Sequence, residues 1–278
     1  LLLLSSLPVS ALAATWDIGK GDITVNAGSG GQTVTQGGGA AVEDNAPVIK
    51  GSSTENTVTI NAEKDQTANV TLSGANIDVS SAGKAAVSTT GEGNVNIELN
   101  GSNALKSGHS HAGLEKNNDG NLTIQDKDKD GSLNAKGGQD GAGIGGGSSG
   151  AGSDITISGG EVNASGGKSG AGIGGDSSGG KGNNITVSGG TIDAKGGEHS
   201  AGIGGGGNSS HKDASKITIS GGDVKATGAG SAAGIGGGNG GSGTDIEITG
   251  GKVTATGGEQ GAGIGGGNGG NGSLFRIV

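Results

Sequence analysis

Three aspartates at alternate positions form the clearest candidate for site chemistry in this chain. Asp126, Asp128 and Asp130 stand in the run DKDKDG, which matches the first half of the calcium-loop pattern D-x-D-x-D-G. Carboxylates at this spacing can converge on Ca²⁺, which takes oxygen ligands. The twelfth position of the pattern is Gly137, where such loops carry a bidentate Glu. A calcium site, the one cofactor the sequence indicates, and a solvated corner between two strands are therefore both open interpretations.

Two histidines, His109 and His111, are the other candidate metal ligands. Alternate residues of a strand face the same side, so a strand here would present both imidazoles together. No third ligand stands near them in the sequence, which favours two exposed corner residues without a metal. The chain contains no Cys, so disulfides and Cys-based zinc sites are excluded.

The distribution of acidic residues does not favour an enzyme. Enzymes that cleave polysaccharides need clustered carboxylates, or a carboxylate beside a basic residue, in a groove. Glu161, Asp193, Asp223 and Glu247 occupy scattered positions that do not recur in one column of the repeat. We therefore predict no catalytic residues, and a polysaccharide lyase-like enzyme is the less favoured alternative.

The composition excludes several classes of protein. Of 278 residues, 70 are Gly, only two are Pro, and the aromatic residues are one Trp and one Phe. Collagen needs Gly at every third position and abundant Pro, so this chain is not collagen. The net charge is -9 and Arg276 is the single Arg, whereas a nucleic-acid-binding protein presents a basic face. We predict no nucleic-acid partner.

A repeat of about 30 residues organises the chain from about residue 120 onward. Three short phrases recur in fixed order, as in Ile155–Ile157, then Val162–Ala164, then Ala171–Ile173. The third phrase ends in an isoleucine whose successive spacings are 29, 30, 32 and 29 residues. These isoleucines are Ile144, Ile173, Ile203, Ile235 and Ile264.

Each phrase alternates apolar and small or polar residues, which is typical of a strand with one buried face. Three such arms separated by Gly-Gly corners make one coil, and stacked coils align their isoleucines in a column. Parallel coils satisfy their backbone groups at a spacing of about 4.8 Å. The sequence therefore predicts an all-β parallel β-helix, a solenoid of stacked three-arm coils with about 30 residues per coil. Degenerate phrases extend this pattern toward the N-terminus.

The predicted organisation has four parts. Residues 1–13 are an apolar run ending in A-x-A, which we interpret as a clipped signal peptide cut after Ala13. Residues 14–120 form degenerate coils with a cap, in which Trp16 plugs the N-terminal mouth. Residues 121–272 are the regular Gly-rich coils, and 273–278 are an irregular or truncated end. Unless packing or a ligand holds them, Gly-rich loops such as 236–243 are expected to be mobile.

A column of glycines is a candidate contact surface. The residue that we expect to face outward from the third arm is Gly at every coil, which would leave the backbone bare for close approach. A second chain, giving self-association, a glycan, and the protein's own Gly-rich loop are all candidates to cover it, and the loop is favoured. The column consists of Gly143, Gly172, Gly202, Gly234 and Gly263.

Three stretches of the sequence resemble a known family. They are Trp16–Ile18 after the apolar run, residues 95–114, and the ITISGG/VNASGG/GAGIGGG repeats. Together they are similar to the glycine-rich, repeat-containing parallel β-helix surface proteins of Gram-positive bacteria, which are labelled carbohydrate-binding-domain-containing. The resemblance covers nearly the whole chain after residue 13. It implies an exported, secreted or wall-associated protein with a glycan-binding role.

We therefore expect a secreted or cell-surface module for carbohydrate binding or adhesion, with a purely structural stalk or spacer as the alternative. Sugar sites usually contain aromatic platforms, and this chain offers only Trp16 and Phe275. Contacts with a polysaccharide or host glycan would then use backbone groups, polar side chains or a bridging cation. The N-terminal apolar run is too short to span a bilayer, so we predict no membrane span. The residues that would contact the glycan are not identified by the sequence.

Overall fold

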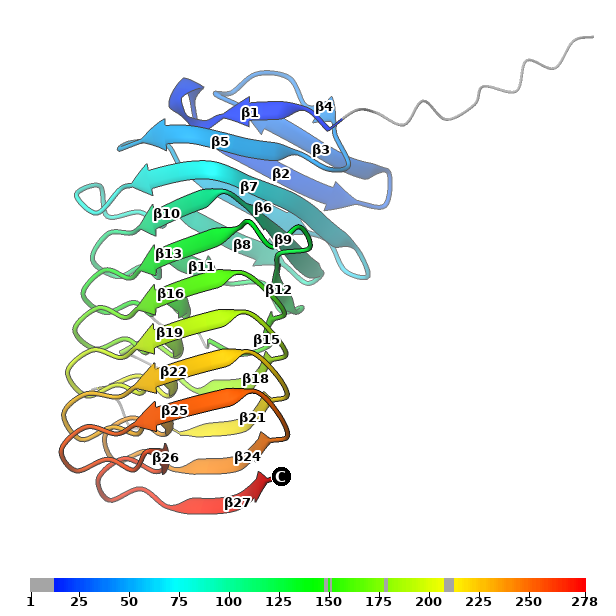
Figure 1. Cartoon of the computed structure of the whole chain (residues 1–278). Helices are drawn as coiled ribbons and strands as arrows, with labels where there is room; N and C mark the ends of the chain where they lie inside the picture. Colours follow the sequence, from blue (N-terminus) through cyan, green and yellow to red (C-terminus); the bar gives the residue numbers. More distant parts are fainter. Residues whose placement is uncertain (1–12, 148–149, 151, 178–179, 208–212) are drawn as a thin grey trace, which may run out of the picture.

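The protein is a parallel β-helix, as the sequence predicts (Figure 1). The computed structural model describes residues 13–147, 150, 152–177, 180–207 and 213–278. The predicted signal peptide lies outside the described residues except for Ala13. Within the described part of the chain, no helix is both long and apolar enough to cross a bilayer.

Each coil has three arms, and strands of the same arm pair in parallel from coil to coil. The first arm consists of β9 (Asn94–Asn100), β12 (Leu122–Gln125), β15 (Ile155–Ile157), β18 (Gly182–Val187), β21 (Ala214–Ile219), β24 (Gly243–Ile248) and β27 (Gly272–Ile277). The second consists of β10 (Ser102–Lys106), β13 (Ser132–Lys136), β16 (Glu161–Ser165), β19 (Thr191–Lys195), β22 (Asp223–Thr227) and β25 (Lys252–Thr256). The third consists of β6 (Val58–Ala62), β8 (Val87–Gly91), β11 (Leu114–Lys116), β14 (Ile144–Gly145), β17 (Ile173–Gly174), β20 (Ile203–Gly204), β23 (Ile235–Gly236) and β26 (Ile264–Gly265).

The interior is a set of aliphatic columns, because the alternating apolar residues of every arm point inward. Ile144 pairs with Ile173, and Ile173 with Ile203, down the third arm. These residues are fully buried, as are Ile155 of the first arm and Val162 of the second. The predicted in-register stacking of the isoleucines is thus confirmed.

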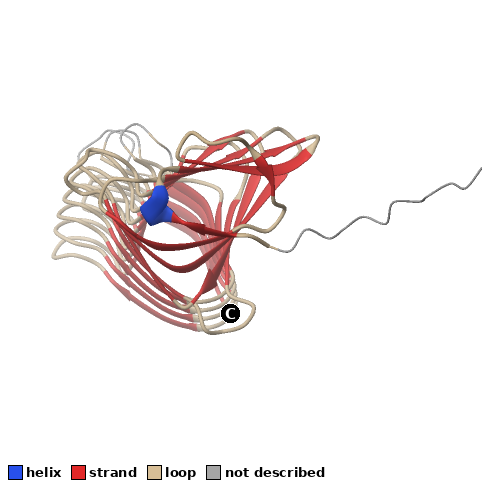
Figure 2. Ribbon diagram, turned by 90° about the horizontal axis from the view of Figure 1, so that it is seen from above, coloured by secondary structure: helices blue, strands red, loops and turns tan. Residues whose placement is uncertain are grey.

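From β15 onward, differences in coil length are absorbed in one place, the loop from the third arm to the next first arm. From Ile173 to Gly182 the chain takes nine residues, and from Ile203 to Ala214, the structural equivalent of Gly182, it takes eleven. Seen along the stack, the strands of the coils lie over one another and the loops gather at the corners between the arms (Figure 2). The columns stay in register because variation is confined to these loops.

The Gly-rich loop 236–243 is held by packing, so the condition we set for its mobility is not met. In the loop 236–243, the amide of Gly237 donates to Gly265 O at 2.9 Å. The amide of Asn239 donates to His199 O at 2.9 Å, which fixes the loop to a corner turn of the preceding coil. Each such bond stabilises a backbone group that would otherwise need water.

The glycine column faces inward, so the prediction that it faces outward is wrong. Gly143 is buried, and a Cβ there would lie 2.6 Å from the amide nitrogen of Ser165 and 2.6 Å from the carbonyl oxygen of Gly172. Gly172 has the same surroundings, with Lys195 N at 2.5 Å. The third arm therefore packs directly on the backbone of the second arm, and only Gly fits. Gly143, Gly172, Gly202 and Gly234 are buried and Gly263 is half-buried, so the protein's own backbone covers most of the column. Self-association along the column stays a prediction.

The N-terminal end is closed by a cap in which pairing turns antiparallel. Strand β2 (Ile23–Gly28) pairs in parallel with β6 but antiparallel with β3 (Gly31–Gln36), which pairs with β4 (Val42–Glu43). Strand β1 (Thr15–Asp17), followed by the 3-10 helix η1 (Ile18–Lys20), pairs with β5 (Val48–Ser53). Trp16 is half-buried in β1 and packs against the core at this end, as predicted.

We predicted an irregular or truncated end at residues 273–278, and the irregular alternative is wrong because these residues continue the solenoid. Strand β27 pairs with β24 in register, Phe275 beside Ile246 and Ile277 beside Ile248. The alternation of Phe275 and Ile277 is the same period of two that defines the first arm elsewhere.

Candidate functional site

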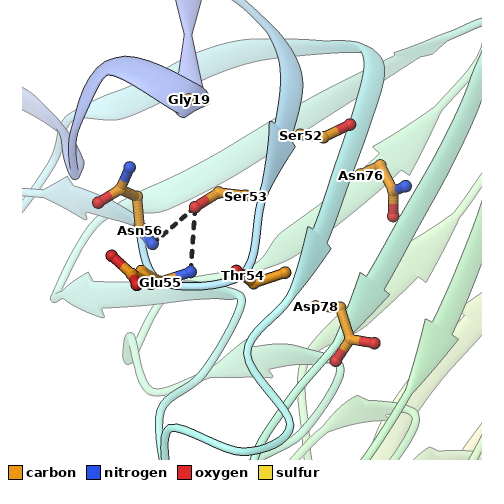
Figure 3. A pocket seen from close by; sticks show the side chains of 8 residues that line it. All are labelled: Gly19, Ser52, Ser53, Thr54, Glu55, Asn56, Asn76 and Asp78. Carbon is orange, nitrogen blue, oxygen red and sulfur yellow. Dashed lines mark hydrogen bonds between the residues drawn. The ribbon is translucent and has the colours of Figure 1, made fainter.

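A hollowed polar surface lies outside the second arm of the first coils, and we call it the polar groove. It runs over β5, over β7 (Thr67–Asp78, which spans the first two arms), and over β10 and β13. Two adjoining hollows of about 370 and 220 Å³ share Asn76 and Asp78. The larger hollow is lined by Gly19, Ser52, Ser53, Thr54, Glu55, Asn56, Asn76 and Asp78 (Figure 3).

Strand register places the floor residues of the groove in one row. Ser52 pairs with Asn76, Asn76 with Ala104, and Ala104 with Asn134. All four belong to the outward positions of their strands, and adjacent strands are about 4.8 Å apart. Ala104 has the smallest side chain of the row, so it leaves space between the two asparagines. The row thus offers hydroxyl and amide groups separated by a depression.

The floor groups are available to a ligand. The side chains of Ser52, Thr54, Asn76 and Asn134 are exposed, and none makes a hydrogen bond to another described residue. An amide side chain offers an acceptor oxygen and two donor hydrogens, which matches sugar hydroxyl groups that both donate and accept. The groove can therefore exchange hydrogen bonds with water for hydrogen bonds with a polyol.

A fixed turn forms one wall of the groove. Ser53 Oγ accepts hydrogen bonds from the amides of Glu55 and Asn56 at 3.1 and 2.8 Å (Figure 3). The Asn56 side chain in turn donates to Ile18 O at 2.9 Å. Since these groups already bond within the protein, they position the wall and leave Thr54 at its rim.

A charged row runs parallel to the polar row. Asp78 pairs with Lys106 at 3.0 Å between Oδ2 and Nζ, and the hydroxyl of Ser80 donates to Asp78 Oδ1 at 2.6 Å. The Ser80 hydroxyl, and after it Lys106, lower the pKa of the Asp78 carboxyl below its usual value. Lys136 follows Lys106 in register and is exposed, with no ion pair to any other described residue.

These charges favour binding over catalysis. A general acid or base works best with a pKa near the operating pH, and the pKa of Asp78 is moved the other way. Lys136 brings an uncompensated positive charge to a groove in a protein of net charge -9. The groove is therefore suited to a ligand with hydroxyl groups and an occasional carboxylate.

The structure does not bring the three aspartates of the predicted calcium site together around one point. Asp126 uses its carboxylate within its own loop, accepting from the amides of Asp130 and Gly131 at 3.3 and 3.1 Å. Asp126 and Asp130 line one hollow of about 640 Å³, whereas Asp128 lines another, beside Glu98 and Lys127. Among the described residues, no group of three or more His, Cys, Asp or Glu is arranged to hold a metal ion.

The two histidines stand on a corner turn. His111 N donates to Gly108 O at 3.0 Å, closing the turn, and the His111 ring pairs with Glu115 at 2.8 Å. His109 faces Asp140 of the next coil at 3.4 Å. The imidazoles therefore have separate carboxylate partners rather than a common ligand.

The scattered carboxylates of the regular coils are mostly paired with basic residues. Asp193 lies 3.0 Å from Lys195, Asp223 lies 2.9 Å from Lys252, and Glu247 pairs with Arg276. Glu161 lines the hollow beside Asp126. The predicted absence of a single acidic column agrees with this arrangement, and the absence of catalysis itself stays a prediction.

Sequence reasoning missed the polar groove. Asn76, Asn134 and Lys136 appear in the sequence as ordinary outward residues of degenerate arms. The coils of this region differ in length, and Gly51 breaks the register between β5 and β7, so the row only becomes visible once strands are aligned. The available signal was an asparagine between two apolar residues, as in Ala75–Ile77 and Leu133–Ala135.

Comparison with known proteins identifies the repeat. A family model for the beta helix repeat matches residues 129–148, 155–180, 185–207, 217–239 and 246–268. These are the regular Gly-rich coils, and they show a parallel β-helix repeat protein. No protein with a curated description and no solved structure matches the chain.

Proposed function

We propose that this parallel β-helix repeat protein is an exported, non-catalytic module that binds polysaccharide in the polar groove. The observation that carries the proposal is the row Ser52–Asn76–Ala104–Asn134, with its unpaired amides and hydroxyls beside Lys136. A row with a step of about 4.8 Å lies across the strands, so an extended chain would lie along the axis of the stack.

The chemistry of the groove favours an acidic polysaccharide. Hydroxyl groups of each sugar match the Asn and Ser side chains, and a carboxylate matches the Lys136 ammonium. No aromatic residue lines the groove, so each contact is weak, and affinity depends on several sugars bound together.

The decisive experiment is a binding titration of the full chain with acidic and neutral polysaccharides, each in calcium and in EDTA. The proposal expects saturable binding that weakens at least about tenfold in the double variant Asn76→Ala/Asn134→Ala. It also expects loss of acidic selectivity in Lys136→Ala. Lys225→Ala removes the same charge from the second arm outside the groove and should bind normally. Equal affinity in all variants would contradict the proposed site.

Two outcomes would redirect the proposal. Release of unsaturated uronates from an acidic polysaccharide would establish a lyase, for which Asp78 and Lys106 provide the carboxylate and basic residue. No binding to any polysaccharide would favour the structural stalk, which is supported by the continuous stack of coils and its in-register columns.

A further inference from the structure

The first described residues of the chain are attached to the cap through one buried carboxylate. Asp44 is 2% exposed. Its Oδ2 accepts hydrogen bonds from the backbone nitrogen of Ala14 at 3.1 Å and from Trp16 Nε1 at 2.8 Å. Its Oδ1 accepts from the amide of Ala46 at 3.1 Å. The carboxylate thus accepts three hydrogen bonds, two from residues 14–16 and one from the residue that follows Asn45.

Ala14 is held on both sides. Its carbonyl oxygen accepts a hydrogen bond from Val48 N at 2.9 Å, in line with the pairing of β1 and β5. Ala13, in contrast, is exposed. The boundary between exposed and fixed backbone therefore falls at the Ala13–Ala14 peptide bond, where the A-x-A pattern of residues 11–13 predicts processing.

We propose that cleavage after Ala13 creates an α-ammonium group on Ala14 that binds the buried Asp44 carboxylate, so that processing locks the N-terminal cap. This inference rests on the export that forms part of the proposed function. Hydrolysis breaks the bond between Ala13 C and Ala14 N; the oxygen of the water enters the new Ala13 carboxylate, and both of its protons go to the Ala14 nitrogen, which becomes an ammonium group. A backbone amide that donates one hydrogen bond becomes a cation at the same position.

The gain is electrostatic. A buried carboxylate is costly unless it is paired and hydrogen-bonded, and neither Trp16 nor the amides bring a charge. A hydrogen bond between ammonium and carboxylate is roughly twice as strong as one between neutral groups. Among the described residues, none forms an ion pair with Asp44 through its side chain. The charged residues on the strands around it are Asp17 in β1, Glu43 in β4 and Lys50 in β5, with Asp78 at the far end of β7.

The pH dependence has a definite sign. An α-amino group has an ordinary pKa of about 7.7–8.0, and the Asp44 carboxylate raises it in the folded protein. The added stability is complete below the unfolded pKa and is lost as the pH rises through the folded pKa. The chain that begins at Ala14 should therefore be more stable than a longer chain at pH 7, and equally stable at about pH 11.

The first test needs no export. A chain that begins at Ala14 is released from a removable fusion protein, and the matched control begins at Ala13. The rate of acylation of the α-amine is followed against pH by mass spectrometry. We expect its midpoint at least about one pH unit higher in the Ala14 protein than in the control, and a higher urea midpoint at pH 7. The same midpoint in both proteins would overturn the docking of the ammonium.

A variant separates charge from packing. In Asp44→Asn the Ala14 and Ala13 proteins should have equal urea midpoints, because the anion is gone. If this variant fails to fold, the acylation midpoints of the wild-type pair decide alone. A difference between the two lengths that persists in folded Asp44→Asn would contradict the proposed pairing.

The processing step has its own readout. The chain from residue 1, preceded by an initiating Met and a basic segment, is expressed in an exporting bacterium, and the mass of the product is measured. A product that begins at Ala14 is expected. A product that begins elsewhere would overturn the cleavage site and the export proposal, while leaving polysaccharide binding by the groove to its own titration.

Discussion

The first coils and the Gly-rich coils fill the same solenoid by different means. In the first coils, buried polar side chains join one coil to the next: Asn103 accepts from Ala75 N at 2.9 Å and donates to Ser132 O at 3.0 Å. In the Gly-rich coils the same task falls to the backbone, as where Gly175 N donates to Gly204 O at 2.9 Å. Hydrogen bonds between successive coils can thus come from buried polar side chains or, where glycine leaves room, from the backbone.

The transition between the two regions occurs at the third-arm strand β11. Glu115 stands in register with Gly145 of the next coil. The Glu115 carboxylate, 7% exposed on its side chain, accepts from Ala112 N and Asn117 Nδ2 at 3.1 and 2.8 Å. A Cβ on Gly147 would stand 2.1 Å from this carboxylate. A side chain at position 147 would therefore displace the Glu115 carboxylate from its hydrogen-bond partners.

The largest effect is expected where glycine in a regular coil allows the third arm to pack on the backbone of the second arm. Gly172→Ala places a Cβ 2.5 Å from Lys195 N and 2.6 Å from Gly202 O, both backbone atoms that cannot move aside. Overpacking of cores costs about 1–3 kcal/mol, and here we expect a loss above about 3 kcal/mol in urea unfolding. Gly30→Ala, with nothing within 4 Å, should change the unfolding free energy by less than about 0.5 kcal/mol. Similar losses in both variants would contradict the packing argument.

The next effect concerns the side-chain network of the cap. Asp44→Ala leaves the donors of Ala14, Trp16 and Ala46 without their acceptor, and an unsatisfied buried group costs about 1–3 kcal/mol. We expect faster hydrogen exchange in β1 and β4 while the regular coils stay protected, because a solenoid unfolds coil by coil. Glu43→Ala removes an exposed acidic side chain of β4 that makes no hydrogen bond or ion pair to a described residue, and it serves as the control. Uniform loss of protection along the chain would show that the two regions are not independent.

A smaller effect is expected at the transition itself. Lys116 is 4% exposed and donates to Asn118 O at 2.6 Å, and burial lowers its pKa below the usual value. Since the unfolded chain then binds more protons, the stability of the wild type rises with pH between the folded pKa and about 10.4. Lys116→Met should lack this rise and be about 1 kcal/mol more stable at pH 7. Lys225→Met, at an exposed position, should leave the pH profile unchanged, and a matching profile in Lys116→Met would refute the burial cost.

The smallest effect is expected in the groove. The lowered pKa of Asp78 means that its contribution to stability is present above the unfolded pKa of about 3.9 and is lost as the pH falls through the folded pKa. Asp78 and Lys106 are each 44% exposed on their side chains, so screening limits the loss in Asp78→Asn to a few tenths of a kcal/mol at pH 7. The difference from the wild type should disappear once the pH is below the folded pKa of Asp78. A larger difference that persists in acid would point to packing rather than charge.

The alternation of apolar residues in the sequence predicted the isoleucine columns. The sequence did not predict the face of the third arm on which the glycines lie. Ile144, Ile173 and Ile203 could be aligned because their period of about 30 residues and the period of two within each arm are written in the chain. The inward direction of Gly143 could not be derived, since a residue without a side chain gives no sign of the face on which it lies. Its place follows from the contact between two arms, which only the folded coil contains.

The site was missed for a related reason. Asn76 and Asn134 lie 58 positions apart in the sequence, and their relation passes through Ala104 and two strand pairings. Counting residues places them only if each intervening coil has a known length. In the first coils those lengths vary. The row can therefore be found from the pairing of the strands, but not from the spacing of residues in the sequence.

The confinement of length variation to one loop also bears on how such a protein can change size. Every regular coil presents the same aliphatic interior to the coil on either side, and its irregular residues lie off that interior. Unequal recombination between two repeats would therefore add or delete a complete coil without a new core having to be found. Each event would lengthen or shorten the molecule by about 4.8 Å. The length of the molecule could therefore change in steps of one coil.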